Sequence, residues 1–161
     1  MIRDVGSADY GRITAIYNHY VEHTTVSMEL EPVSEQEMRE RAEQVLDGHF
    51  PYVVAEHDGL VAGFAYAHHW KSRLAYRFTC ESAIYVDRSL LRHGIGSELM
   101  ADLIRRCKEA GIRNLIACIT ADNVRSIKFH EQFGFKQASH FVNAGYKFST
   151  YLDVIDLQLQ L

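Results

Sequence analysis

Two glycines near the middle of the chain stand where a strand-like run gives way to a helix. The run Ser82-Ala83-Ile84-Tyr85-Val86 is followed by Arg92-His93-Gly94-Ile95-Gly96-Ser97, which opens a strongly periodic helix. Glycine lets backbone N–H groups approach a ligand closely, and the first helical turn adds unpaired donors and the positive end of the helix dipole. The segment predicts either an anion site that fits a pyrophosphate or a turn that uses glycine for geometry alone.

Two common nucleotide-binding motifs do not account for this turn. A dinucleotide-binding Gly-x-Gly-x-x-Gly motif needs a third glycine where Leu99 stands, and an acidic residue near position 116 is also missing. A P-loop needs Gly-Lys-Ser/Thr at a spacing that the chain lacks. The glycines therefore predict neither nucleotide motif.

The overall composition fits one domain spanning residues 1–161. The chain is 47% hydrophobic, which suffices for a substantial core, and only two prolines and no linker or repeat interrupt it. A formal net charge of −4 argues against a nucleic-acid or anionic-membrane surface. Three cysteines without a Cys-x-x-Cys pair indicate neither a disulfide framework nor a thiolate zinc site. With no targeting segment and no apolar run long enough to span a bilayer, we expect a cytoplasmic protein.

The nine histidines invite a metal hypothesis, which the spacing does not support. His19 and His23 share a helical face and His68 and His69 are adjacent, but no further Cys, His or Glu completes a coordination sphere around either pair. We expect no metal.

Periodicity of the apolar residues predicts an α/β fold with a mixed sheet. The expected strands are residues 2–5, 52–56, 60–66, 78–86, 115–119, 135–142 and 150–159, and the expected helices are residues 9–21, 34–48, 95–111 and 123–133. The run 115–119 is almost wholly apolar, which is typical of a central strand covered on both faces and parallel to the strand before the glycines. The helix at 95–111 is then the crossover between them.

This order of elements resembles the GNAT acetyltransferase superfamily, whose Arg/Gln-x-x-Gly-x-Gly/Ala loop holds the acetyl-CoA pyrophosphate. Leu91 stands where that pattern has Arg or Gln, and Arg92 follows one place late. A second pattern matches as Asn123-x-x-Ser126-x-x-x-His130-Glu131-x-x-Gly134-Phe135, with histidine in place of the usual tyrosine. The resemblance implies a mixed, mostly antiparallel central sheet of about six to seven strands flanked by helices, with acetyl-CoA as cosubstrate and no metal.

A closer likeness is to phosphinothricin N-acetyltransferases and their methionine sulfoximine/sulfone relatives, and it covers nearly the whole chain. It runs through Ala65-Tyr66-Ala67, Trp70-Lys71, Glu81-Ser82 and Gly145-Tyr146-Lys147-Phe148-Ser149-Thr150-Tyr151-Leu152-Asp153. Two departures stand out. The early Asn/Ser-Phe-Arg-x-Glu-Pro segment is Ser27-Met28-Glu29-Leu30-Glu31-Pro32 here, and Tyr151 replaces a tryptophan. Substrate choice is therefore expected to differ.

The resemblance implies a set of cofactor-binding residues. The loop at 92–97 would cradle the pyrophosphate, and the backbone around Tyr85 and Val86 would orient the pantetheine arm. Asn123 would hold that arm, cap its own helix, or do both. The expected cofactor-binding residues are Tyr85, Val86, Arg92, His93, Gly94, Ile95, Gly96, Ser97, Asn123 and Ser126.

Acetyl transfer to an amine needs a base for the ammonium proton and a proton for the departing thiolate. Glu81 is the expected base; without the resemblance, a salt-bridged or edge-facing carboxylate would be the simpler interpretation. His130 occupies the place of a general-acid tyrosine, and it would protonate the thiolate or relay the amine proton. The alternative for His130 is a hydrogen-bonded imidazole packed between Phe129 and Phe133.

An amino-acid-like substrate would need a cation for its carboxylate. Arg77 shares a strand face with Glu81 if the strand begins at residue 77, and a guanidinium binds a carboxylate through two parallel hydrogen bonds. Arg73 and Lys147 are the competing cations. Trp70, Tyr76 and Met28 would wall the side-chain pocket, or they are ordinary core residues.

The favoured function is N-acetylation of a small amino acid or analogue such as phosphinothricin, methionine sulfoximine or methionine sulfone. The alternatives are acetylation of a polyamine or protein N-terminus, and a non-catalytic acyl-CoA sensor. We also expect a homodimer, because the alternating apolar C-terminal end would extend or cover a sheet edge.

Overall fold

A seven-stranded sheet with the strand order β1-β2-β3-β4-β5-β7-β6 forms the centre of the protein, which a computed structural model describes over residues 1–161. Only β4 and β5 pair in parallel, and every other pairing is antiparallel. The predicted mixed sheet of six to seven strands is thus confirmed. No helix is long and apolar enough to span a membrane.

The element bounds lie within a few residues of those expected from the sequence. The strands are β1 (Ile2–Asp4), β2 (Tyr52–His57), β3 (Leu60–His69), β4 (Thr79–Val86), β5 (Asn114–Thr120), β6 (Lys136–Lys147) and β7 (Thr150–Gln160). The helices are α1 (Tyr10–His23), α2 (Glu35–Asp47), α3 (Ile95–Glu109) and α4 (Val124–Gln132). Short 3-10 turns that the sequence analysis did not predict occur at Ser7–Asp9, Leu74–Tyr76 and Arg88–Leu90.

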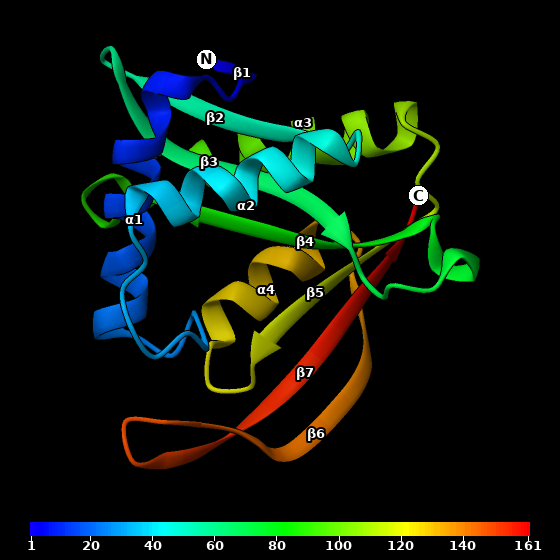
Figure 1. Cartoon of the computed structure of the whole chain (residues 1–161). Coiled ribbons are helices and arrows are strands. Elements are labelled where there is room, and N and C mark those ends of the chain that lie inside the picture. The colour runs from blue at the N-terminus through cyan, green and yellow to red at the C-terminus, as the bar shows by residue number, and fades with distance from the viewer.

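The helices cover both faces of the sheet. Helices α1 and α2 lie on one face of β2, β3 and β4, whereas α3 lies on the opposite face (Figure 1). Gly63 lets α3 approach β3 closely, because a Cβ there would lie 3.1 Å from Leu99 Cδ1 and 2.8 Å from the Tyr85 carbonyl oxygen. The buried face of α3 is the periodic apolar stripe of its sequence.

Local features of the sequence account for a hairpin turn and the starts of two helices. The Ser34 side chain accepts a hydrogen bond from Glu37 N and so caps α2. Asp58 and Gly59 both have positive φ values, 51° and 76°, as the tight hairpin between β2 and β3 requires. Gly94, with φ of 81°, stands directly before α3.

The parallel pairing at the centre of the sheet is short. Strands β4 and β5 pair only where Thr79–Glu81 meets Asn114–Ile116. Beyond Glu81, β4 continues beside β3 and β5 continues beside β7, so the two strands diverge (Figure 1). The remaining β4 backbone therefore has a free edge on the side that faces β5.

One expectation about the second half of the sheet is confirmed and one is wrong. The strand at 115–119 is buried apart from Cys118, which is exposed where β5 has moved away from β4. The C-terminal strand does not extend or cover an edge, because β7 lies between β5 and β6 with Leu157 fully buried. The outer edge strands of the sheet are β1 and β6.

A buried lysine joins the loop between α1 and α2 to the β6–β7 hairpin. Lys147 is 2% exposed, and its ammonium donates a hydrogen bond of 2.6 Å to the Ser27 carbonyl oxygen. Burial lowers the pKa of Lys147, and nearby Glu29 acts in the opposite direction. In the same contact Met28 packs on Gly145, where a Cβ would overlap the methionine methyl group. The lysine and the glycine together fix the position of the loop.

We expect Lys147→Met to destabilise the fold by about 1–2 kcal/mol, because it keeps the aliphatic stem but leaves the Ser27 carbonyl without its donor. Urea unfolding would measure the change. Lys136→Met, at an exposed position of the same strand, is the matched control and should shift the unfolding free energy by less than about 0.5 kcal/mol. Equal stability of the two variants would contradict a structural role for Lys147.

Candidate active site

A groove of about 300 Å³ lies where the end of β4 meets the first turns of α3 and α4, and we call it the α3–α4 groove. It brings together eight of the expected cofactor-binding residues: Val86, Arg92, Gly94, Ile95, Gly96, Ser97, Asn123 and Ser126. It also contains side chains that the sequence analysis did not assign to the cofactor, including Tyr20, Leu91 and Phe129. Arg125 lines it as well, at a place suited to a phosphate.

The first turn of α3 presents unpaired donors to this groove. The first helical hydrogen bond runs from Glu98 N to the Gly94 carbonyl oxygen, so the N–H groups of Ile95, Gly96 and Ser97 precede the helical ladder. Arg92 has a φ of 70°, which for a residue with a side chain is an uncommon left-handed conformation. These donors and the helix dipole favour an anion at this position.

Two expected cofactor residues keep their side chains out of the groove. The Tyr85 ring packs against Tyr17, Tyr20 and Phe64, with ring centroids 5.1 to 5.5 Å away, so only its backbone remains for a ligand. The exposed His93 ring donates from Nδ1 to the Leu91 carbonyl oxygen.

Two hydrogen bonds shape the ends of the groove. Asn123 accepts a hydrogen bond of 3.2 Å from Ser126 N and thereby caps α4, as one of its two expected roles requires. The Tyr20 hydroxyl donates to the Val86 carbonyl oxygen at 2.5 Å, so α1 holds the end of β4.

Glu81 lies at the vertex of the two diverging strands. It is opposite Ile116 in the last β4–β5 pair and opposite His68 in the antiparallel β3–β4 pair. Its side chain is partly buried and makes no ion pair with Lys or Arg, so the salt-bridged alternative does not describe it. The carboxylate therefore stands beside the free edge of β4.

The surroundings of Glu81 favour its protonated form. Burial raises the pKa of Glu81 above its ordinary value of 4.5, the Asp156 carboxylate raises it further, and His68 opposes the change. Asp156 lies on β7 opposite Cys118, and its carboxylate accepts a hydrogen bond of 2.9 Å from the Ser139 hydroxyl. A carboxylate with a raised pKa is a stronger base than an ordinary one once it has lost its proton.

His130 is a buried imidazole. It is 3% exposed, and its ring stands edge-on to Phe129 and Phe135 rather than between Phe129 and Phe133. Its Nδ1 lies 2.8 Å from the Ser126 carbonyl oxygen, which can only accept, so Nδ1 carries the proton and Nε2 carries a lone pair. Burial lowers the pKa of His130 below 6.5, although the Ser126 carbonyl acts in the opposite direction. A neutral imidazole at pH 7 suits a proton acceptor better than a general acid.

The expected substrate residues do not gather at one pocket. Arg77 precedes β4 and is exposed, and its guanidinium lies over the Phe78 ring and donates to the Leu74 carbonyl oxygen. The expectation that it shares a strand face with Glu81 is therefore wrong. Arg73 is exposed on the same loop, where Trp70 and Tyr76 pack edge-on to each other with Lys71 over both rings.

Met28 and Lys147 lie elsewhere, in the contact between the α1–α2 loop and the β6–β7 hairpin. Neither they nor Trp70 and Tyr76 line the α3–α4 groove. The Lys147 side chain is buried, and its ammonium donates to the Ser27 carbonyl oxygen.

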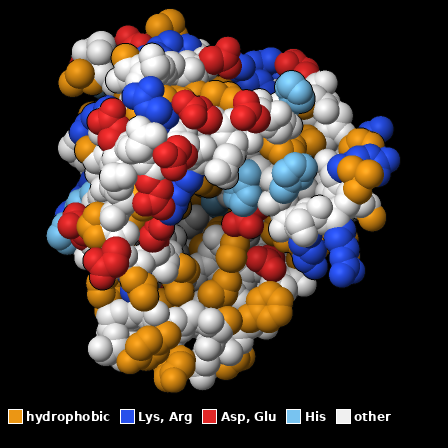
Figure 2. All heavy atoms as spheres, viewed as in Figure 1, with side chains coloured by type: hydrophobic (Ala, Val, Ile, Leu, Met, Phe, Trp, Pro, Cys, Tyr) orange, Lys and Arg blue, Asp and Glu red, His pale blue; other side chains and the backbone are white.

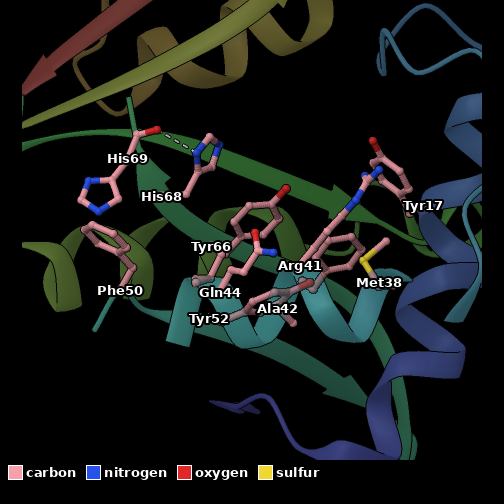
Figure 3. Close-up of a pocket in the computed structure, with 12 residues that line it drawn as sticks. Tyr17, Met38, Arg41, Ala42, Gln44, Phe50, Tyr52, Tyr66, His68 and His69 are labelled. Carbon is pink, nitrogen blue, oxygen red and sulfur yellow. Dashed lines mark hydrogen bonds between the residues drawn. The ribbon is translucent and has the colours of Figure 1, made fainter. Parts of the chain in front are cut away.

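A second cavity, of about 340 Å³, lies between α2 and the sheet, and we call it the α2 cavity. Its lining is aromatic and apolar with a few polar groups, among them Arg41, Tyr52, Tyr66 and His68 (Figure 3). The face that carries α2 is hollowed near its middle, with histidine and acidic side chains around the hollow (Figure 2). Sequence periodicity gave no signal for this cavity, because its aromatic residues are spaced as ordinary core residues are.

Comparison with known proteins supports the family that the sequence motifs suggested. The family model for the acetyltransferase (GNAT) family matches residues 13–135. A phosphinothricin N-acetyltransferase of Alcaligenes faecalis is 40% identical over 161 residues, which cover 99% of this chain and 82% of that protein. An L-methionine sulfoximine/L-methionine sulfone acetyltransferase of Salmonella typhimurium is 33% identical over 99% of this chain and 94% of that protein.

Solved structures agree. A GNAT superfamily phosphinothricin acetyltransferase of Sinorhizobium meliloti, solved in complex with AcCoA, superposes with a TM-score of 0.97 at 36% identity, over 100% of this chain and 88% of the other. The resemblance expected from the two motifs is confirmed. With a mixed sheet that opens between β4 and β5, a helix N-terminus at the opening and a family model that matches most of its length, the chain belongs to the acetyltransferase (GNAT) family.

Proposed function

We propose that this protein transfers the acetyl group of acetyl-CoA to the primary amine of a small amino acid or analogue of the phosphinothricin, methionine sulfoximine or methionine sulfone type. The observation that carries the proposal is the position of Glu81, a partly buried acid with a raised pKa at the vertex of β4 and β5. The relatives that act on such amino acid analogues support the choice of substrate.

Cofactor binding and removal of the amine proton are the steps that groups of the site would assist. Acetyl-CoA supplies a thioester, and the α3 N-terminus would hold its pyrophosphate while the free β4 edge around Val86 offers N–H donors to the pantetheine and the thioester carbonyl. Glu81 takes one proton from the substrate ammonium, directly or through water. The neutral amine then forms the C–N bond as the C–S bond breaks, and the second proton that the nitrogen loses passes to the departing thiolate.

His130 would relay the amine proton rather than supply the proton for the thiolate. Its Nδ1 is occupied by the Ser126 carbonyl oxygen, and its lowered pKa leaves Nε2 unprotonated and able to accept near neutral pH. This choice between the two expected roles rests on the buried surroundings of the ring.

The substrate carboxylate is assigned to Arg77, with Arg73 as the competing residue. Both lie on the exposed loop that leads directly into β4, and Arg77 stands two residues before that strand. Unlike Lys147, they keep guanidinium N–H groups free to form the two parallel hydrogen bonds that a carboxylate accepts.

We also propose a homodimer and a cytoplasmic location. Large apolar side chains are exposed along β6 and the β6–β7 hairpin, among them Val142 (71%), Tyr151 (66%) and Phe148 (56%), and orange side chains gather at this end of the molecule in Figure 2. The outer edge of β6 is unpaired, so a second copy would cover both features. The three free thiols fit a reducing compartment.

The reaction is tested by release of free thiol from acetyl-CoA with phosphinothricin, methionine sulfoximine, methionine sulfone and spermidine in parallel. We expect turnover with the amino acid analogues and a fall in kcat of at least about 100-fold in Glu81→Gln, because the base is lost. In the wild type, kcat/KM should rise with pH through a pKa above 4.5, since Glu81 acts only when ionised. Glu109→Gln, at an exposed position of α3, is the charge-matched control.

In the same panel, Arg77→Ala should raise KM for the amines that bear a carboxylate and leave spermidine unaffected. An equal loss for all amines would remove Arg77 from this role. Turnover of spermidine alone would indicate that the substrate is a polyamine. Binding of acetyl-CoA without thiol release for any amine would favour an acyl-CoA sensor.

The proposed relay through His130 predicts that His130→Phe lowers kcat by about 10- to 100-fold while the fold persists, because the ring site is already lined by phenylalanines. The pH dependence of the free energy of unfolding is the control measurement. The native pKa of His130 lies below the unfolded value of about 6.5, so the unfolded state binds the proton more readily. The wild type should thus lose stability as the pH falls below about 6.5, and the variant should lose less. If kcat is unchanged in the variant while the pH dependence of its stability differs from that of the wild type, His130 has a structural role only.

The proposed dimer predicts a sedimentation-equilibrium mass of two chains. Val142→Lys places a charge in the exposed apolar end and should shift the equilibrium to one chain. Leu74→Lys is the matched control, because Leu74 is 76% exposed and lies on the loop before β4. Dissociation by Leu74→Lys and not by Val142→Lys would place the interface elsewhere.

A further inference from the structure

The proposed reaction leaves a proton on Glu81, and the carboxyl group must lose that proton before the next turnover. Glu81 is partly buried, and burial raises its pKa, which favours the protonated form. His130, the other imidazole of the site, is 3% exposed and does not line the α2 cavity. The proton on Glu81 therefore needs another route to solvent.

His68 stands directly opposite Glu81 on the neighbouring strand. The two residues are partners in the antiparallel β3–β4 pairing, and such partners lie on one sheet face with Cβ atoms about 4.5 to 5.5 Å apart. Their charges interact, because burial raises the pKa of Glu81 and His68 acts in the opposite direction. The only side-chain hydrogen bond of His68 is to the His69 backbone, so a proton would pass from Glu81 to His68 through one water molecule.

The His68 ring is oriented to accept a proton at Nε2. Its Nδ1 lies 2.9 Å from the His69 carbonyl oxygen, which can only accept, so in the neutral ring Nδ1 carries the proton and Nε2 carries the lone pair. This hydrogen bond is drawn in Figure 3, where the ring lies beside Tyr66 at a centroid distance of 5.8 Å. His68 is half-buried and lines the α2 cavity, and the hollow on this face has histidine side chains at its rim (Figure 2). The ring therefore has access to water.

Several other titratable groups near Glu81 keep their own protons. Burial raises the pKa of Tyr66 on β3, of Tyr85 on β4 and of Cys118 on β5, the last to about 12. All three are therefore protonated near neutral pH and cannot accept a proton there. Arg41, which reaches the α2 cavity from α2, is a permanent cation without a lone pair.

Asp156 on β7 is the remaining charged group that acts on Glu81. Its carboxylate accepts a hydrogen bond of 2.9 Å from the Ser139 hydroxyl, and its charge raises the pKa of Glu81. An aspartate is in general a weaker base than a neutral imidazole. Asp156 therefore makes Glu81 a stronger base, whereas His68 is the group suited to take the proton away.

We propose that His68 takes the proton of the Glu81 carboxyl group and releases it to water in the α2 cavity. The inference rests on the proposed function and adds the step that regenerates its base. The O–H bond of Glu81 breaks, an N–H bond forms at Nε2 of the neutral ring, and the imidazolium then gives that proton to water. His68 acts through Glu81 and does not contact the substrate, so it is a positioning residue.

The first test is thiol release at saturating acetyl-CoA and amine in a dilute buffer, with methionine sulfone or phosphinothricin, whichever is turned over faster. His68→Ala should lower kcat about tenfold, and added imidazole should restore most of it, because the free base can occupy the vacated space. His69→Ala removes an imidazole that lines the same cavity but stands opposite Cys80. It should keep kcat and should not respond to imidazole.

The response to imidazole decides the outcome of this test. If imidazole fails to rescue a His68→Ala protein that binds acetyl-CoA as the wild type does, the proposal is wrong. Equal stimulation of the wild type or of His69→Ala would also contradict it.

The second test follows the titration of the Glu81 carboxyl carbon by carbon-13 NMR, with Glu81→Gln to identify the resonance. His68→Gln should raise the pKa of Glu81, because the charge that opposes the effect of burial is lost. The rise of kcat/KM with pH should move to higher pH in the same variant. His69→Gln makes the same change one residue away and should leave both profiles unchanged. Identical Glu81 titrations in the three proteins would overturn the proposal.

The two tests separate this inference from the proposed function. Absence of thiol release in the wild type would refute the reaction, and the NMR titration would still decide whether His68 is coupled to Glu81. Thiol release that depends on neither His68 nor imidazole would refute the proton route alone.

Discussion

The parallel pairing of β4 with β5 over only three residues is the constraint on which the rest of the site depends. Had the two strands stayed paired to their ends, every backbone donor of β4 would be used within the sheet. Because they separate after Glu81, the sheet presents free N–H groups at its own centre, next to an α-helix N-terminus and a carboxylate. The short pairing of β4 with β5 therefore determines both which backbone N–H groups are free and where the Glu81 carboxylate lies.

The separation of β4 from β5 also explains why each pKa shift at the site arises from the immediate surroundings of the group. Glu81 is far enough inside the sheet for burial to raise its pKa, yet the open strand edge gives a small ligand access to it. His130 reaches a buried position from α4 and remains neutral there. Burial thus raises the pKa of Glu81 toward neutral pH and lowers the pKa of His130, so that the imidazole is neutral and able to accept a proton.

Much of the fold and part of the site follow from the sequence. The Asp58-Gly59 turn, the Ser34 cap and the apolar stripe of α3 are local physical signals, and they agree with the expected strands 52–56 and 60–66 and the expected helices 34–48 and 95–111. The glycine loop and Asn123 likewise gather at one groove. Contacts between distant segments had no such signal. Arg77 was expected to share a strand face with Glu81, but it ends a 3-10 turn, and Lys147 was expected as a possible cation for the substrate carboxylate, but it is buried against the α1–α2 loop.

The same lack of local signal hid the α2 cavity. Its walls come from α1, α2, β2 and β3, and each aromatic residue in it has the spacing of an ordinary core residue. Only the packed molecule brings these residues around one cavity.

The position of the last strand has a consequence for how the molecule is made. Strand β5 pairs with β7 along its whole length, and the α1–α2 loop is held by Lys147, which is 120 residues away from Ser27 in the chain. Until the C-terminal hairpin has been synthesised, β5 keeps an unpaired edge and the loop has no anchor. During translation the N-terminal half can form its own hairpin and helices early, whereas the central opening is completed only when the final strand arrives. A ribosome-bound chain that lacks its last strand would therefore carry the catalytic residues without the architecture that makes them active.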